Sequence, residues 1–221
     1  MTTVDGKRGP AIGQMAVIHR TFRREFATAP ALVRALQPGD SARIELVTEH
    51  LRNVLDGLHI HHTGEDEILW PLLEQRAPEE AARVKLMVDQ HERVDQLVGQ
   101  LTALLPQLAA DPAAYREDTA AKLEELGAEL ETHMTDEEAD LLPLVARHVT
   151  AEEWAQLGKH GLARTDKSRR LLTLSNILDT ATPEERQLFL AELPAPVKVM
   201  WKLFGKRQLA RARTSLYGVA A

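Results

Sequence analysis

The feature of this sequence that most constrains its fold is a set of polar residues that occurs twice at matched spacing. Each set holds two histidines 42 residues apart and a glutamate four residues after the second histidine, and the second set follows the first after 72 residues. The two sets are His19, His61 and Glu65, and then His91, His133 and Glu137. The same shift places Met15 on Met87 and Pro71 on Pro143. Self-similarity over this distance predicts duplicated helical hairpins, related by a pseudo-two-fold axis through the polar residues.

Apolar residues recur with helical periodicity along almost the whole chain, and strand-like alternation is not sustained anywhere. Short connections between long helices predict an all-α fold, an up-down antiparallel four-helix bundle. Pro71 is expected to kink or close the second long helix. The predicted helices run from about Ile12 to Ala27 with a short turn of helix at Ala31 to Leu36, from Asp40 towards Glu74, from Pro78 to Leu105, and from Asp111 to His148.

A different organisation is expected after residue 148. Thr150 with Glu153, and Thr182 with Glu185, have the spacing of capping boxes that begin shorter helices. From Lys159 to the end the chain carries twelve Lys and Arg against five Asp and Glu. The predicted division is therefore a four-helix bundle over residues 1–148 and a basic helical extension over residues 149–221 that packs on the bundle.

Composition limits the chemistry and the location of the protein. The chain has no cysteine, which excludes disulfides, iron-sulfur ligation and thiol catalysis and leaves nitrogen and oxygen as metal ligands. The early apolar stretch from Ala11 to Ile18 is too short to span a membrane and runs into His19 and a basic patch. We expect a cytoplasmic protein without a membrane span, and the net charge of −6 does not favour nucleic acid as a partner.

The repeated residues have the arrangement of a buried metal cage. Positions four apart lie on one face of a helix, so His61 and Glu65 point the same way, as do His133 and Glu137. With one histidine from each of the other two helices, four imidazoles and two carboxylates can surround two metal ions. Imidazole is a neutral donor for iron, copper, nickel or zinc, whereas two buried glutamates without a metal would be costly. A ferritin-like site is excluded because no glutamate stands three residues before a histidine.

These motifs resemble those of the hemerythrin-like, or HHE cation-binding, family over roughly Ile12 to His148. They are His19 in AVIHRTF, His61 to Glu65 in HHTGEDEILWP, His91 in VDQHERVDQL, and His133 to Glu137 in HMTDEEADLLP. The resemblance implies two iron ions in an oxo- or hydroxo-bridged centre, with the six residues named above as metal ligands. It also implies O2, H2O2 or NO as small ligands.

The sequence departs from the oxygen-carrying members of the family. Those proteins have a third-helix HxxxH pair and, on the fourth helix, an aspartate five residues after the histidine. Here Met87 stands where the pair would place a second histidine beside His91, so the chain is more similar to the bacterial branch that does not carry oxygen. Glu138 stands at the position of that aspartate, but the internal repeat favours Glu137 as the ligand, with Glu138 as second choice.

The remaining histidines are expected to be surface or packing residues. His62 is rotated about 100° from His61 on a helix, which predicts that it faces solvent or lies outside the ligand set. His59 is similarly off the ligand face, and His50 and His148 have no matched partner. His160 is the one that could approach the site if the extension folds over the bundle. Met15 and Met87 are interpreted as apolar packing beside the site.

Two functions follow as hypotheses. The first is a non-haem di-iron protein that binds or turns over O2, H2O2 or NO, with oxidative or nitrosative stress defence as a candidate role. The alternative is a metal-dependent sensor or regulatory module that acts through its basic tail. The sequence leaves open whether the protein is an enzyme, which metal is native and which oligomeric state it adopts.

Overall fold

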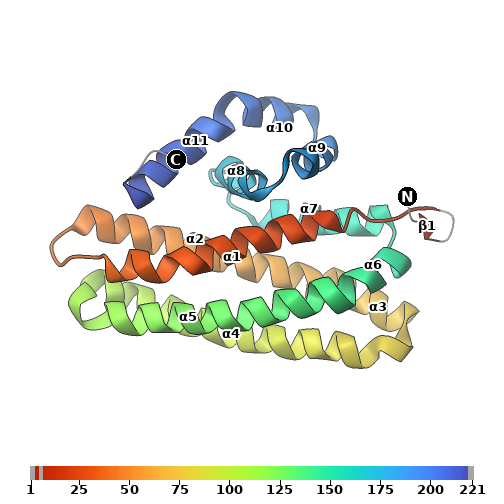
Figure 1. Ribbon diagram of the computed structural model, residues 1–221, viewed down its shortest axis with the longest axis horizontal. Helices are drawn as coiled ribbons and strands as arrows, with labels where there is room; N and C mark the ends of the chain where they lie inside the picture. The colour runs from red at the N-terminus through yellow and green to blue at the C-terminus, as the bar shows by residue number, and fades with distance from the viewer. Residues whose placement is uncertain (1–2, 5–6, 219–221) are drawn as a thin grey trace.

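The computed structural model describes residues 3–4 and 7–218 and has an up-down four-helix bundle as its body (Figure 1). The bundle helices pack in a closed ring in which α1 contacts α5, α5 contacts α4, α4 contacts α2, and α2 contacts α1. In this ring α1 lies across from α4 and α2 across from α5, which is the pairing that the 72-residue repeat predicts. The helices are α1 Gly13–Arg34, α2 Ser41–Gly64, α4 Ala81–Ala110 and α5 Pro112–Asp136.

The predicted helix starts are present, but two predicted ends are wrong. Asp40 and Asp111 each accept a hydrogen bond from a backbone N–H of the first turn of α2 and α5. The predicted break between Ala27 and Ala31 does not occur, because α1 continues through Pro30. Proline normally breaks a helix by removing a backbone donor. Pro30 is buried, so its packing offsets that loss. Similarly, α4 continues through the exposed Pro106 to Ala110.

Both ligand-bearing helices change to a π-helical turn at the glutamate of the repeat. The π segment η1, Glu65–Leu69, follows α2 directly, and η3, Glu137–Leu141, follows α5. In each segment the N–H five residues on, at Trp70 and Leu142, donates to the carbonyl of the glutamate. The helices then continue as α3, Trp70–Arg76, and α6, Leu142–His148. The kink predicted at Pro71 is therefore a π turn that ends just before the proline.

Residues 149–218 form an extension on the α1 and α2 side of the bundle (Figure 1). Its helices are α7 Ala151–Arg164, α8 Arg170–Thr180, α9 Pro183–Ala191, α10 Ala195–Met200, the π segment η4 Trp201–Gly205, and α11 Lys206–Tyr217. Both predicted capping boxes, at Thr150 and Thr182, are present. α7 packs on α2 and η1, α8 and α9 pack on α1, and η4 and α11 pack on α8.

Three short elements complete the described chain. The 3-10 turn η2, Pro78–Glu80, precedes α4. Strands β1, Thr3–Val4, and β2, Lys7–Arg8, pair in antiparallel orientation near α6, and the sequence did not predict them. Within residues 3–4 and 7–218, no helix combines the length and the apolar character needed to cross a membrane.

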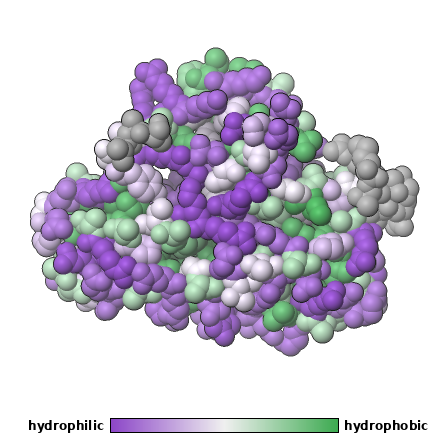
Figure 2. All heavy atoms as spheres, viewed as in Figure 1, coloured by the Kyte–Doolittle hydropathy of each residue, from purple (hydrophilic) through white to green (hydrophobic). Residues whose placement is uncertain are grey.

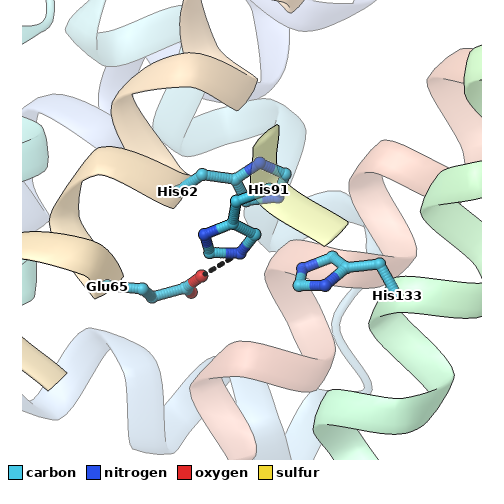
Figure 3. A group of neighbouring side chains, drawn as sticks. All are labelled: His62, Glu65, His91 and His133. Carbon is cyan, nitrogen blue, oxygen red and sulfur yellow. Dashed lines mark ion pairs between the residues drawn. The ribbon is translucent and has the colours of Figure 1, made fainter. Parts of the chain in front are cut away.

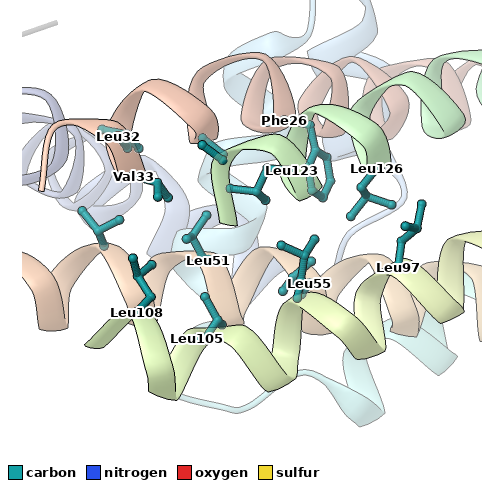
Figure 4. Close-up of a cluster of buried hydrophobic side chains, with 14 of the residues drawn as sticks. Phe26, Leu32, Val33, Leu51, Leu55, Leu97, Leu105, Leu108, Leu123 and Leu126 are labelled. Carbon is teal, nitrogen blue, oxygen red and sulfur yellow. The ribbon is translucent and has the colours of Figure 1, made fainter. Parts of the chain in front are cut away.

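Two apolar clusters fill the bundle and leave a polar band between them. The larger cluster, part of which Figure 4 shows, lies towards the α1–α2 and α4–α5 connections and includes Phe26, Leu55, Leu105 and Leu123. The smaller cluster lies around α3 and α6 and contains Met15 and Met87, as the packing interpretation requires. The repeated histidines and glutamates lie between these clusters, so their surroundings are dry and of low polarity.

Candidate metal centre

All six residues of the internal repeat lie together in the interior of the bundle. The side chain of His61 is 10% exposed, and those of the other five are almost completely buried. Each carboxylate lies between two imidazoles that come from different helices. The Nε2–Oε distances are 3.1 Å for His19 and Glu137, 3.3 Å for His61 and Glu65, 3.5 Å for His91 and Glu65, and 3.9 Å for His133 and Glu137.

These converging atoms are not satisfied by hydrogen bonds. Among the described residues, the Nε2 atoms of the four repeat histidines and both oxygens of Glu65 and Glu137 are buried and form no hydrogen bond, although His19 and Glu137 are close enough for an ion pair. Leaving one buried polar atom unpaired costs about 1–3 kcal/mol, so a cluster of them needs another source of stabilisation. Cations at the centre would supply it, because lone pairs of imidazole and carboxylate are metal donors. The residues present therefore fit a metal site.

The outer nitrogens of His19 and His91 are held by carboxylates. His19 Nδ1 lies 2.8 Å from Glu138 Oε1, which also accepts a hydrogen bond of 2.7 Å from Arg23. His91 Nδ1 lies 2.7 Å from Asp66 Oδ1. Such contacts fix the tautomer that leaves Nε2 free for a metal. Glu138 thus contacts the outer side of His19, whereas Glu137 lies on the inner side.

A longer chain of polar side chains supports His133. His133 Nδ1 lies 3.2 Å from Gln90 Oε1, and Gln90 Nε2 donates to Asp136 Oδ2 over 2.8 Å. Because an amide oxygen only accepts, this contact requires a proton on Nδ1 of His133 and leaves its Nε2 as a lone-pair donor. These supporting residues, together with Arg23 and Asp66, were not predicted from the sequence.

His62 differs from the sequence-based prediction. It was expected to face solvent or lie outside the ligand set, yet it is 2% exposed and lies within the cluster (Figure 3). Its ring stacks on that of His91 with centroids 4.2 Å apart, and both of its nitrogens are buried and form no hydrogen bond with any residue that the structure describes. The physical reason is that α2 has both α1 and α4 as neighbours, so an arc of more than 100° of its surface faces the interior.

The donor atoms form two overlapping groups that share Glu65. One group contains His62, Glu65, His91 and His133, and the other contains His19, His61 and Glu65, with the atoms of each group within 4.8 Å of one another. Glu137 adds a second carboxylate that lies between His19 and His133. This arrangement suits two cations with carboxylates between them.

The pKa values of these groups match a site that carries neutral imidazoles. Burial lowers the pKa of His61 and of His62 well below the usual range, and that of His133 to about 3. Burial together with the charge of Glu137 raises the pKa of Glu65 well above its usual range. A neutral imidazole is the form that binds a metal. Most of the nitrogen donors therefore do not have to release a proton when a metal binds.

His19 and Glu137 form the charged pair of the site. Burial alone would lower the pKa of His19, but Glu137 and Glu138 raise it to about 9. Burial alone would raise the pKa of Glu137, but the charge of His19 lowers it to about 2. At neutral pH His19 is therefore protonated. Its positive charge substitutes for part of the charge that a metal would bring.

The other histidines lie outside the two donor groups. His160 is buried where α7 crosses α2, with its Cδ2 only 3.2 Å from where a Cβ on Gly64 would lie. Its Nδ1 contacts Arg164 and Glu67. His50 of α2 forms an ion pair with Glu25 of α1, and the exposed His59 forms an ion pair with Asp95. His148 is partly exposed at the end of α6.

In a comparison with known protein families, residues 11–145 match the hemerythrin HHE cation binding domain. No curated protein and no solved structure gives a significant match. The matched range contains the whole set of converging histidines and glutamates and stops before the extension. The chain therefore belongs to the hemerythrin family of HHE cation binding domains.

Proposed function

We propose that this protein binds two iron ions and uses them to bind or turn over a small oxygen or nitrogen species, O2, H2O2 or NO. The proposed ligands are His19, His61, Glu65, His91, His133 and Glu137. The observation that carries the proposal is the set of buried, unpartnered donor atoms that face one another between two apolar clusters. Glu65 and Glu137, each between two imidazoles, are the proposed shared ligands.

We add His62 to the proposed ligand set. Its two buried nitrogens lack a hydrogen-bond partner, and its donor atom groups with those of Glu65, His91 and His133. The repeat places Met134 at the equivalent position of the other half, so His62 makes the two metal positions unequal. One position would have an additional nitrogen donor, and the other would keep a place for an exogenous ligand.

The chain's own residues prepare the site for this chemistry. A pair of iron ions supplies a site that binds small ligands and exchanges electrons with them. Glu138, Asp66 and Gln90 orient three imidazoles by holding their outer nitrogens. The apolar clusters on both sides exclude bulk water, which strengthens electrostatic interactions within the site. His19 can hold or release a proton at the edge of the centre.

The test compares the iron-loaded protein with His61→Ala and with a control variant, His59→Ala, two residues away on the exposed face of α2. We expect O2, NO or peroxide to change the optical spectrum of the wild-type and control proteins. His61→Ala should lose this response together with part of its iron. A response that is identical in His61→Ala would contradict the proposed site. Continuous release of oxygen from peroxide would identify an enzyme, whereas stoichiometric binding would identify a carrier or sensor.

A regulatory module is the second candidate, because α7 of the extension lies directly on the ligand-bearing turn. Arg164 of α7 forms an ion pair with Glu67, two residues after the proposed ligand Glu65, at 3.0 Å. His160 packs on Gly64, the residue before Glu65. A change of metal content would therefore alter the contacts that α7 of the extension makes with this turn. Hydrogen exchange of residues 151–164 that differs between metal-free and loaded protein, without turnover, would favour this candidate. The expected cytoplasmic location remains a prediction that cell fractionation would test.

A further inference from the structure

The segment formed by α10, η4 and α11 presents one face to α8. Trp201, Gly205 and Leu209, spaced four residues apart, are buried on this inner face. The contact is close at Gly205, where an added Cβ would lie 2.6 Å from Ser175 Oγ of α8. Because this face is held against α8, the opposite face is fixed towards solvent.

The outer face carries large apolar side chains that the described part of the chain leaves about half exposed. We call Val199, Met200, Leu203 and Phe204 the apolar crest; they are exposed by 54%, 48%, 64% and 52%. Their spacing of one and four residues places them side by side over little more than one helical turn. In the space-filling view, hydrophobic atoms lie at the top of the molecule, over α10 (Figure 2). The crest is a projecting surface, and polar atoms surround it.

Basic residues flank the crest, and the sequence around it contains no acidic residue. Residues 193–221 contain six Lys and Arg and no Asp or Glu. Since the whole chain has a net charge of −6, the residues before 193 carry −12 against the +6 of this segment. Lys202, Lys206, Arg207 and Arg211 are exposed, and among the described residues none of them forms an ion pair with a carboxylate. The segment therefore combines exposed apolar area with uncompensated positive charge.

We propose that the apolar crest and its basic flank bind the surface of an anionic lipid bilayer. Amphipathic segments that lie in a membrane interface insert apolar side chains between headgroups while Lys and Arg contact anionic lipids. The crest meets both requirements on one outward face. A second copy of the chain is disfavoured as occupant, because this face would bring two positive segments together. Nucleic acid would be held by the basic residues alone and would not need an apolar crest.

The position of the segment permits this contact. α10 and η4 lie on the side of the extension away from the bundle, with α8 between them, whereas the end of α11 returns to the bundle, where Arg43 of α2 donates to the carbonyls of Ser215 and Leu216 (Figure 1). A flat surface can therefore reach the crest before it reaches the acidic bundle. Salt at physiological strength screens charges beyond about 8 Å, so repulsion of the bundle by the same surface is weakened.

The experiment measures binding of the full chain to vesicles by flotation. Vesicles of phosphatidylcholine alone are compared with vesicles of phosphatidylcholine and phosphatidylglycerol, at low and at physiological salt. We expect binding to the anionic vesicles only, weakened by salt. Lys202→Gln with Lys206→Gln should weaken binding by roughly 25-fold, about fivefold for each charge. Leu203→Ser with Phe204→Ser should weaken it by at least about tenfold, since two large apolar side chains no longer insert.

The matched control is Lys85→Gln with Leu86→Ser, which removes an exposed lysine and an exposed leucine from α4 of the bundle. It should bind vesicles as the wild-type protein does, and circular dichroism should be the same for all variants. Equal loss in the control, or no binding by the wild-type protein, would overturn the proposal. So would binding of an oligonucleotide that depends on Lys202 and Lys206 while vesicles are not bound. Self-association that is lost in Leu203→Ser with Phe204→Ser, without vesicle binding, would assign the crest to a second copy instead.

Discussion

Two carboxylates hold the outer nitrogens of His19 and His91 in the same way. Glu138 of η3 contacts His19 of α1, and Asp66 of η1 contacts His91 of α4. The repeat relates these pairs, because Asp66 shifted by 72 residues falls on Glu138. The repeat therefore contained the signal for both supporting residues, and extending the comparison to acidic residues beside the ligands would have found them.

Removing these carboxylates should weaken metal binding without unfolding the bundle. In Asp66→Ala or Glu138→Ala we expect the metal affinity to fall about 10- to 100-fold, because the imidazole loses the partner that fixes its orientation. Competition with a chelator would measure this. Asp89→Ala serves as the control, since Asp89 pairs with Lys85 on the surface of α4. Unchanged affinity in both site variants would show that the two carboxylates have no positioning role.

His62 could not be predicted from the repeat, because its counterpart is Met134. We expect His62→Met to make the halves alike and to weaken one of the two metal positions, while the other keeps its affinity. Metal titration followed by optical absorption or isothermal calorimetry should then show two steps closer together than in the wild-type protein. His59→Met tests for an unspecific effect of histidine loss on α2. Two steps unchanged from wild type would remove His62 from the ligand set.

At the scale of the element, the π turns at Glu65 and Glu137 are the least predictable part of the bundle. The prolines at 71 and 143 indicated an irregularity, but proline permits a kink, a break or a π turn. The continuity of α1 through Pro30 and of α4 through Pro106 was missed for a related reason: the packing of the whole helix in the bundle, rather than the local preference of one proline, decides the outcome. Helix starts, which depend on local capping side chains, were predicted correctly at Asp40, Asp111, Thr150 and Thr182.

Replacing a proline after a π turn should raise the stability of the metal-free protein and lower its affinity for metal. In Pro71→Ala or Pro143→Ala the restored N–H can form an α-helical bond, so the metal-free protein should become more stable by about 1 kcal/mol. The glutamate would then turn away from the cluster, and metal affinity should fall by about tenfold. Pro106→Ala, in the interior of α4, should raise stability alone. Equal affinity in all three variants would mean that the π turns do not position the glutamates.

The extension is attached to the bundle through a buried carboxylate. Glu25 of α1 lies 3.1 Å from His50 Nε2 and accepts a 2.8 Å hydrogen bond from Asn176 of α8. Burial would raise the pKa of Glu25, but His50, Asn176 and Arg24 lower it to about 2. Because the pKa is lower in the folded state, the contribution of Glu25 to stability is present above pH 4.5 and is lost as pH falls towards 2.

We expect Glu25→Gln to lower the free energy of unfolding by about 3 kcal/mol at neutral pH and to flatten its dependence on pH between about 4.5 and 2. Denaturant unfolding at several pH values would measure both effects. Glu124→Gln, which removes an exposed partner of Arg34, should leave the midpoint unchanged. If Glu25→Gln matches this control, the buried carboxylate does not hold α8 on the bundle.

At the scale of the whole molecule, the sequence predicted the bundle and the convergence of six side chains because both follow from helical periodicity and a duplicated pattern. It did not predict how the extension lies, since that depends on contacts between helices far apart in the chain, such as α8 on α1. The molecule that results places buried donor atoms in the bundle and a basic, apolar surface on the far side of the extension. Its proposed metal and lipid functions thus occupy separate parts of the chain.

The most direct test of the proposed metal centre is metal analysis combined with the optical spectrum of protein purified in air and of protein reconstituted with Fe²⁺. We predict two irons per chain and an absorption band of a bridged ferric pair, with both lost in a double variant, Glu65→Ala with Glu137→Ala. Chelation should also lower the unfolding temperature of the wild-type protein, because the metal binds only the folded state. A colourless protein that takes up no iron, or iron uptake that persists in the double variant, would contradict the account.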